Sequence, residues 1–340
     1  MTTARRKLLA GAFAALTVLA ATTACSGSPD GADEILVYNA QREPLTKVWV
    51  DAFTRETGIK VTLRNGGDAD LARQLVAEGE GSPADVFLTE NSPAMAQVER
   101  AGLFADLDDA TLAQVPAQYR PRSGKWTGIG ARSAVFAYNT TALPADGLPA
   151  SLLDLRQPQW KGRWSADTVG TDFQVIAAGL LAAQGEDATR AWLRGVKETA
   201  VSAPTDALAL RTASTGRAEG ALVFGDYWYR DQAGPRVDSA GTAPHYFRDG
   251  DPGAFVSIAG GGVLRSSKRA EAAQKFVRFV TSNAGQTALL NGFSKDYPVA
   301  SGVLADPALP PLDTLQPPAI DPSALDAEKV TRLMTETGLV

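Results

Sequence analysis

The stretch that decides the fold is ILVYNAQREPLTKVWVDAFTRETGIKVTLRN, residues 35–65. It opens with a short apolar run over 35–40 and then takes helical spacing up to Gly58, where a glycine ends the pattern. Residues 60–65 alternate between apolar and polar side chains, as a strand does. The stretch therefore predicts a strand, a helix and a second strand.

The residues that follow repeat this alternation. Helical spacing returns in DADLARQLVAEG (68–79), and ADVFLTE (84–90) predicts a buried strand. SPAMAQVERAG (92–102) predicts another helix, with Ser92 as its cap. A β-α-β-α-β order implies a mostly parallel sheet with helices on both faces. The first third of the chain therefore predicts an α/β fold.

The rest of the chain follows the α/β pattern less regularly. GARSAVFAYNT (130–140) is an apolar strand long enough to cross between two lobes. The glycine run 260–262 interrupts a second apolar run without the spacing of a phosphate-binding loop, which predicts a crossing strand with closely packed backbones. Helices are predicted over 171–185, 186–198, 205–216 and 269–282, and a last helix near 325–337 follows the proline-rich stretch 307–322.

Three strand ends are candidates for a ligand site, because ligands bind beyond the carboxyl ends of the strands in such sheets. They are NAQRE (39–43), TEN (89–91) and GDYWY (225–229). In the third, Tyr227 and Tyr229 flank Trp228 behind an apolar run. This segment is either an aromatic strand end or a source of phenols for a metal or ligand. The two tyrosines share one side only if the strand continues through them.

The N-terminus has the layout of an export signal. Residues 1–24 combine a basic start with an apolar segment too short for a permanent membrane span, which predicts a secretory signal peptide. Cys25, the only cysteine of the chain, follows small residues and resembles the lipidated cysteine of bacterial lipoproteins. Residues 25–33 predict a flexible tether. Arg5 and Arg6 leave both the general and the twin-arginine export routes open.

Composition argues against several classes of function. The part behind the tether, roughly 310 residues long, suggests two domains or lobes. The net charge of −5 and the lack of a basic block argue against nucleic-acid binding. The only histidine, His245, is accompanied by no G-x-S-x-G or H-E-x-x-H motif, and we interpret it as structural. We therefore do not expect an enzyme, and chemistry by a carboxylate pair is a minor alternative.

Five blocks of the sequence carry a family resemblance when they are taken together. They are VYNAQRE (37–43), ADVFLTEN (84–91), AWLRGVKE (191–198), residues 247–280 and DYPVASGV (296–303). Their order resembles that of the periplasmic ferric-iron-binding proteins, the solute-binding components of ABC importers, over nearly the whole chain. The resemblance implies an α/β, two-lobed periplasmic-binding-protein fold with a ligand cleft between lobes that crossing strands join. It places residues 34–136 with 252–302 in lobe 1, and residues 137–251 with 303–340 in lobe 2.

The resemblance also implies a function. Family members capture ferric iron and deliver it to a membrane permease and its cytoplasmic ATPase. The chain is therefore expected to be an exported, lipid-anchored monomer, in the periplasm or on the outer face of the cytoplasmic membrane. Fe³⁺ is a hard cation that favours anionic oxygen donors. The family supplies a histidine, a glutamate and two adjacent tyrosines, with an anion such as carbonate or phosphate at a helix N-terminus.

Of the family's histidine and glutamate, this sequence keeps the glutamate and replaces the histidine. Glu90 matches the family's glutamate, and Asn91 follows it in the same block. Arg42 stands where the family has its histidine, next to Gln41, and a guanidinium has no lone pair to give to a metal. Arg42 is therefore expected to hold an anion, or to pair with Glu90 when the cleft is empty.

The tyrosine pair can be aligned in three registers. Without gaps, Asp226 and Tyr227 take the two positions. A second register puts Trp228 and Tyr229 there, and a third puts Tyr227 and Trp228 there. We expect at least one of Tyr227 and Tyr229 to bind iron as a phenolate. Glu90 and Asp226 are the other metal ligands that we predict.

The resemblance places the anion at TVGTDFQV (168–175). Gly170 and Thr171 fit a cradle of backbone N–H groups at the start of a helix. Asp172 either repels an anion or caps the helix, and both alternatives stay open. Arg42 and Trp228 also suit a small organic anion or a chelated iron, which is the alternative ligand for the same fold.

Overall fold

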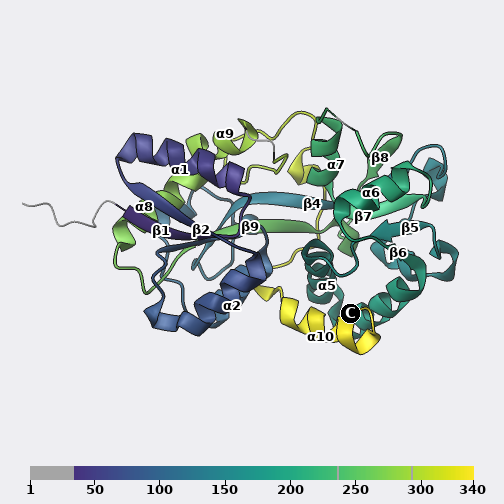
Figure 1. Ribbon diagram of the computed structural model, residues 1–340, viewed down its shortest axis with the longest axis horizontal. Coiled ribbons are helices and arrows are strands. Elements are labelled where there is room, and N and C mark those ends of the chain that lie inside the picture. Colours follow the sequence, from purple (N-terminus) through teal and green to yellow (C-terminus); the bar gives the residue numbers. More distant parts are fainter. Residues whose placement is uncertain (1–33, 236, 292–293) are drawn as a thin grey trace, which may run out of the picture. The chain divides into compact units, whose positions relative to one another are not determined.

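The computed structural model of the protein describes residues 34–235, 237–291 and 294–340 (Figure 1). The predicted signal peptide, the tether and Cys25 lie outside the described residues. Within the described part, no helix combines the length and the apolar character that crossing a membrane needs.

The N-terminal part forms the strands and helices that its periodicity predicts. The elements are β1 (Glu34–Asn39), α1 (Glu43–Thr57), β2 (Lys60–Asn65), α2 (Asp68–Glu78), β3 (Val86–Leu88), α3 (Ser92–Arg100) and the short α4 (Asp109–Leu112). Strand β1 pairs in parallel with both β2 and β3. Gly58 ends α1 in the left-handed conformation at φ 75°, which a glycine adopts without strain. We call β1, β2, β3 and the helices around them lobe 1.

One cap prediction is wrong. Asn91, not Ser92, precedes the first turn of α3, and Ser92 is already helical. The Ser92 hydroxyl instead donates a hydrogen bond to the carbonyl oxygen of Ile258, at 2.6 Å. Ser92 therefore ties α3 to another strand of the sheet and does not cap its own helix.

Two long strands join the lobes (Figure 1). They are β4 (Thr127–Asn139) and β9 (Val256–Val263), and they pair antiparallel over residues 127–133 of β4. The glycine run 260–262 belongs to β9, as predicted, and its Cα atoms lie against other side chains. A Cβ atom at Gly260 would clash with Met95, and one at Gly262 would press on Phe104. These glycines therefore let the crossing strand pack closely.

The second lobe is built around a smaller parallel group of strands. Its elements are β5 (Trp164–Ala166), α5 (Thr171–Thr199), β6 (Ala200–Ser202), α6 (Asp206–Ser214), β7 (Gly220–Phe224), α7 (Gly225–Gln232) and β8 (Thr242–His245). The label α5 covers two helices that meet at a kink at Gly185, where φ is a non-helical 81°, so the boundary predicted between 171–185 and 186–198 is confirmed. We call β5, β6, β7 and the helices around them lobe 2.

The sheet runs through both lobes. Its strand order is β2-β1-β3-β9-β4-β7-β5-β6, and β8 pairs with β4 beside this path. Residues 134–138 of β4 pair with β7, after residues 127–133 have paired with β9. One strand thus contributes to both lobes, so any side chain at its middle lies between them.

The C-terminal part alternates between the lobes. Helices α8 (Ala270–Thr281) and α9 (Asn283–Asn291) lie near α1 in lobe 1 (Figure 1). Leu309 and Leu315 of the proline-rich stretch are buried in the cluster that holds Tyr38. The last helix, α10 (Ala327–Thr337), packs on α5 of lobe 2.

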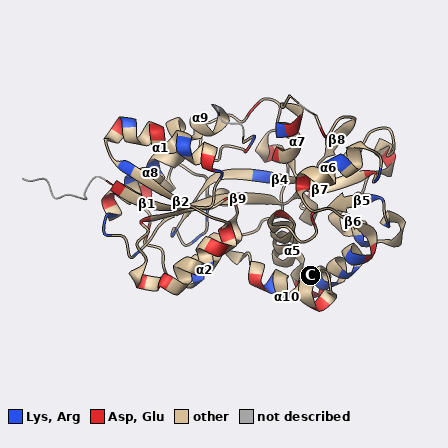
Figure 2. Cartoon of the chain, viewed as in Figure 1, with Lys and Arg blue, Asp and Glu red and all other residues tan. Residues whose placement is uncertain are grey.

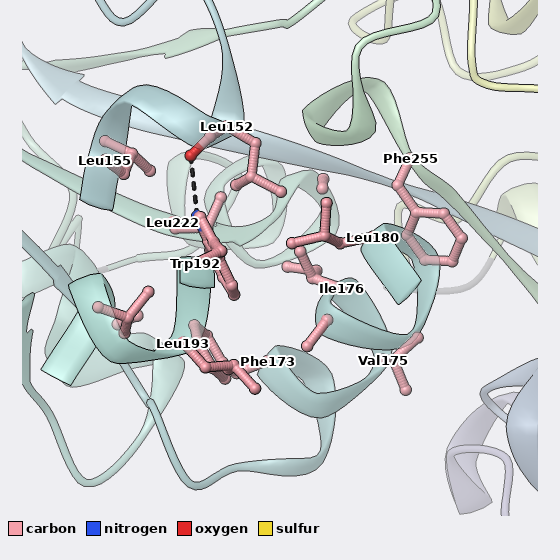
Figure 3. Close-up of a cluster of buried hydrophobic side chains, with 14 of the residues drawn as sticks. Leu152, Leu155, Phe173, Val175, Ile176, Leu180, Trp192, Leu193, Leu222 and Phe255 are labelled. Carbon is pink, nitrogen blue, oxygen red and sulfur yellow. Dashed lines mark hydrogen bonds between the residues drawn. The ribbon is translucent and has the colours of Figure 1, made fainter. Parts of the chain in front are cut away.

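A core of aromatic and aliphatic side chains fixes α5 in lobe 2 (Figure 3). Phe173 stacks on Trp192, with ring centroids 5.3 Å apart, and the Trp192 indole N–H donates to the Leu152 carbonyl oxygen at 2.9 Å. Burying each large side chain stabilises the fold by roughly 1.5–3 kcal/mol. Because Phe173 lies in its first turn, this packing fixes the start of α5.

Candidate functional site

The aromatic segment after Phe224 is a helix, so the strand does not continue through Tyr227 and Tyr229. Strand β7 stops at Phe224, and α7 begins at Gly225. Successive helical residues turn by about 100°, so Tyr227 and Tyr229 point to different sides. Trp228 points in a third direction, and its indole N–H donates to the Thr242 hydroxyl at 2.9 Å.

The two tyrosines have different neighbours. Tyr227 lines a cavity together with Glu90. Tyr229 is buried on the other side of the helix, where its hydroxyl accepts a hydrogen bond from Tyr246 at 3.0 Å. The geometry thus separates two residues that sequence alone treats as equivalent.

The three predicted strand ends meet. A cavity of about 370 Å³ lies between the two lobes, beyond β1, β3 and β7. From the predicted segments it is lined by Ala40, Glu90, Asn91, Thr171, Asp172 and Tyr227. Further lining residues that the prediction did not include are Gly67, Asp68, Asp167, Thr205, Asp206 and Ala207. Both lobes therefore contribute oxygen-bearing side chains to one cavity.

Arg42 bridges the lobes through three carboxylates. Its Nη2 lies 2.7 Å from Glu90 Oε1 and 2.7 Å from Asp226 Oδ2. Its Nη1 lies 3.2 Å from Asp296 Oδ1. Burial would lower the pKa of Arg42, but the three carboxylates outweigh burial and raise it. The pairing of Arg42 with Glu90 that the sequence suggested for an empty cleft is present.

Gln41 supports this arrangement from beside it. Its side-chain oxygen accepts the backbone N–H of Arg42 at 2.8 Å. Its Nε2 is buried and has no hydrogen-bond partner among the described residues. Gln41 therefore orients the backbone of Arg42 and keeps one unused donor.

Arg132 is a site residue that sequence reasoning missed. It lies in the middle of β4, is 2% exposed, and donates to both carboxylate oxygens of Asp172 at 3.0 and 2.9 Å. It also donates to Asn91 Oδ1 at 2.7 Å and lies 3.4 Å from Glu90. Figure 2 shows a basic residue within the otherwise uncharged middle of β4. A charged residue inside so apolar a strand was the signal that could have identified it.

Of the two roles that the sequence left open for Asp172, the structure does not show the helix cap. Gly170 precedes α5, and no side chain caps its first turn. Burial would raise the pKa of Asp172, but the charge and hydrogen bonds of Arg132 outweigh it, so the pKa lies below its usual value. The Tyr227 hydroxyl, which hydrogen-bonds to this carboxylate, lowers that pKa further.

The cavity carries more acidic groups than these arginines neutralise. Burial, and then the charge of Glu90, raises the pKa of Asp68 to about 7. Burial, and then the charge of Asp172, raises the pKa of Asp206 to about 7 as well. Burial is also the main reason that the pKa of Tyr227 lies above its usual value. An added cation would relieve this repulsion.

The chemistry of the cleft is that of oxygen donors and guanidinium groups. Among the described residues, no three or more His, Cys, Asp or Glu side chains are placed to hold a metal ion as they stand. His245 lies elsewhere, with its Nε2 3.0 Å from the Pro149 carbonyl oxygen. The arrangement offers carboxylate and phenol oxygens, the donors that a hard cation prefers, and guanidinium groups, which pair with anions.

Known proteins resemble this chain over most of its length. The profile of the family described as bacterial extracellular solute-binding protein matches residues 81–321. The Fe(3+)-binding periplasmic protein of Serratia marcescens is 50% identical over 306 residues, which cover 90% of each chain. The major ferric iron-binding protein of Neisseria meningitidis serogroup B is 34% identical over 94% of this chain and 97% of its own.

A solved structure shares the fold. Iron-bound HitA from Pseudomonas aeruginosa superimposes with a TM-score of 0.82 at 36% sequence identity. The match covers 90% of this chain and 99% of HitA. The predicted two-lobed α/β architecture is therefore confirmed.

Proposed function

The chain belongs to the family of bacterial extracellular solute-binding proteins, and we propose that it captures ferric iron between its two lobes for an ABC importer. Its role is transport and not catalysis, as for the relatives named above. One observation carries the proposal. Glu90 from lobe 1 and Tyr227 from lobe 2 line one acidic cavity, and the Arg42 guanidinium joins Glu90 to Asp226 of lobe 2.

We propose Glu90, Asp226 and Tyr227 as the protein ligands of the iron. All three offer oxygen atoms, the donors that a hard cation prefers. The Oδ1 atom of Asp226 is buried and accepts no hydrogen bond from any described residue, so it keeps a lone pair for a metal. Tyr227 is favoured over Tyr229 because it lines the cavity together with Glu90, whereas the Tyr229 hydroxyl meets Tyr246 on the other side of the helix.

Arg42 is the internal cation that iron has to replace. Its guanidinium lies 2.7 Å from both Glu90 and Asp226, where the metal would otherwise be. Two unit charges about 4 Å apart interact by about 4 kcal/mol near a protein surface, so the arginine and the metal compete strongly. We propose that Arg42 turns away from Glu90 and Asp226 as iron binds, and keeps its contact with Asp296.

Delivery requires partners that the chain itself does not contain. We propose a membrane permease and a cytoplasmic ATPase as these partners, and a monomer as the working form. Cys25 would carry the lipid that holds the protein at the outer face of the cytoplasmic membrane. Cys25→Ala should therefore move the protein to the soluble fraction without lowering its thermal stability, since the tether precedes the folded part. A variant that stays in the membrane fraction contradicts the anchor.

The cargo can be identified on the protein itself. We expect native mass spectrometry with elemental analysis to find iron on protein purified without chelators. Glu90→Gln should lose most of this iron, whereas the control Glu80→Gln, at an exposed position in lobe 1, should retain it. If the purified protein instead carries an organic anion and no iron, the anion-binding function, which the two cleft arginines would serve, takes its place.

A further inference from the structure

A second cavity lies against the crossing strand β9. It measures about 570 Å³, and Val256 and Ile258 of this strand are part of its lining. Side chains alternate between the two faces of a strand, so Ser257 between them points the other way. There its hydroxyl donates to Oδ1 of Asn91, which lines the cavity of the proposed iron site, at 2.9 Å. The two cavities therefore lie on opposite faces of β9.

The proline-rich stretch 307–322 forms one wall of this second cavity and is held at both ends. Leu315 is buried in an apolar cluster with side chains of α2 and α3, and Leu325, just beyond the stretch, is buried in the core around α5. Three prolines between these two leucines line the cavity: Pro317, Pro318 and Pro322. Proline fixes its own backbone φ, so this wall has few other conformations to adopt. A wall that is already formed lowers the entropic cost of binding a ligand.

Arg120 brings a positive charge to the second cavity. It is half-buried, and its Nε donates to the Val115 carbonyl oxygen at 3.2 Å, which orients the guanidinium. Neither of its Nη groups has a hydrogen-bond or ion-pair partner among the described residues. A guanidinium binds a carboxylate through two parallel hydrogen bonds. Arg120 therefore favours a ligand that carries a carboxylate.

The other charged residues at the second cavity leave Arg120 available. Arg122 is exposed, and its Nε lies 3.7 Å from Oδ2 of Asp321. The other oxygen of Asp321 accepts the backbone N–H and the hydroxyl of Ser323, at 3.0 and 2.7 Å. Asp313 is exposed, so water weakens the repulsion between its charge and a bound anion. The half-buried guanidinium of Arg120 is thus the charge that a ligand would meet.

We propose that this cavity is a second ligand site, which takes a small carboxylic acid with an aromatic or branched aliphatic body. The apolar body packs against Phe255, Ile258 and Leu312, and the carboxylate pairs with Arg120. The volume lies within the roughly 300–1,000 Å³ that small-molecule sites have. The site goes beyond the proposed iron function, because it lies on the other face of β9 and uses none of the proposed iron ligands.

The carboxylate contact can be tested with a pair of probes on iron-free protein. In a calorimetric titration, 2-naphthoate should bind to one site of the wild-type protein. The amide 2-naphthamide, which keeps the two rings and lacks the charge, should bind about tenfold more weakly or worse. Arg120→Gln should weaken the binding of 2-naphthoate by about tenfold or more. Arg73→Gln, which changes an exposed arginine of α2, is the control and should bind like the wild type.

The place of the probe can be tested by filling the cavity. Ala117 is exposed and lines the second cavity, so Ala117→Phe should block the binding of 2-naphthoate without lowering the thermal stability. Ala113→Phe adds the same ring at an exposed position outside the lining and should bind like the wild type. Arg42→Gln changes a guanidinium on the other face of β9 and should also leave the binding of 2-naphthoate unchanged.

Each outcome decides the proposal. Binding that Arg120→Gln weakens and Ala117→Phe blocks, while all three control variants retain it, supports the second site. A wild-type protein that binds no 2-naphthoate, or binds the acid and the amide equally, overturns it. A loss of binding in Arg42→Gln also overturns it, because the probe would then lie in the iron cleft. All titrations use iron-free protein, so each of these results leaves the proposed iron function untouched.

Discussion

The polar groups on the two sides of helix α7 have different kinds of partner. On the cleft side, Asp226 is 3% exposed and lies among arginines, 2.7 Å from Arg42 and 3.1 Å from Arg230. On the other side, Tyr229 is also buried, but it meets Tyr246 and an apolar cluster. Ion pairs can exchange partners when a metal binds, whereas a neutral hydrogen bond between two phenols only stabilises the helix. We call the cleft side, with Asp226 and the arginines around it, the ionic side, and the side with Tyr229 and Tyr246 the phenolic side. We expect iron binding to depend on the ionic side alone, and the phenolic side to contribute only to stability.

The largest loss of unfolding free energy should come from removing Arg132, the buried cation of the ionic side. Arg132→Met leaves Asp172 and Asp226 without their shared guanidinium, and breaking a buried pair in this way costs about 3–5 kcal/mol. Arg163→Met is a close control, because Arg163 also binds one carboxylate and stacks on an aromatic ring, but on a more exposed surface. It should cost less than about 1 kcal/mol. Equal losses in urea unfolding would contradict the view that burial makes the ionic side costly to disturb.

The ionic side should also make stability depend on pH. The pKa values of Asp68 and Asp206 are about 7 in the folded protein, above the unfolded value of about 3.9. The folded state therefore holds these protons more tightly, and the stability they contribute at low pH is lost as the pH rises through about 7. Iron-free wild-type protein should lose more unfolding free energy between pH about 5 and about 8 than the double variant Asp68→Asn, Asp206→Asn. Parallel pH curves for the two proteins would refute the assignment.

Substitutions of Arg42 test how strongly its guanidinium competes with iron on the ionic side. Arg42→His removes the competing guanidinium and adds an imidazole that can bind a metal, so ferric binding should tighten by about tenfold or more. Arg42→Gln removes the charge without adding a ligand and serves as the control for competition alone. Competition titrations against a chelator measure both. Unchanged or weaker binding by Arg42→His, in a protein with a native circular dichroism spectrum, would place Arg42 outside the iron site.

The smallest effect should come from the phenolic side. Tyr246→Phe removes the hydrogen bond to Tyr229 and leaves the ring in place, which should cost about 1 kcal/mol of unfolding free energy. Ferric affinity should not change, because neither phenol faces the cavity. A drop in iron binding as large as that of Glu90→Gln would mean that the two sides of α7 are not separate.

Local sequence patterns were sufficient for most of the fold. The periodicity of 35–65 predicts β1, α1 and β2, and the glycine run 260–262 predicts a crossing strand, because spacing and close packing act over short distances along the chain. The sequence leaves open whether the strand continues past Phe224, since tyrosine and tryptophan favour strands. Tertiary packing overrides that preference, and a helix begins where β7 ends.

The sequence predicts residues of the candidate site only where they lie in a recognisable motif. Glu90 follows from an aligned block and Asp226 from one of the three registers of the tyrosine pair, but the partners that fix them do not. Arg132 lies inside an apolar strand, and Asp296 lies 254 residues from the Arg42 that it binds. Such ion pairs form between segments that only the fold brings together, so no local pattern reports them.

The central claim is that the cleft side of α7 holds ferric iron through the phenolate of Tyr227. A ferric phenolate absorbs visible light, and because a free tyrosine loses its proton only near pH about 10, binding should also release protons. Iron-free wild-type protein titrated with a weakly chelated ferric salt should therefore develop a visible band and acidify a weakly buffered solution. Tyr229→Phe should keep the band, and Tyr227→Phe should lose it. A Tyr227→Phe protein that develops the band at full strength contradicts the claim.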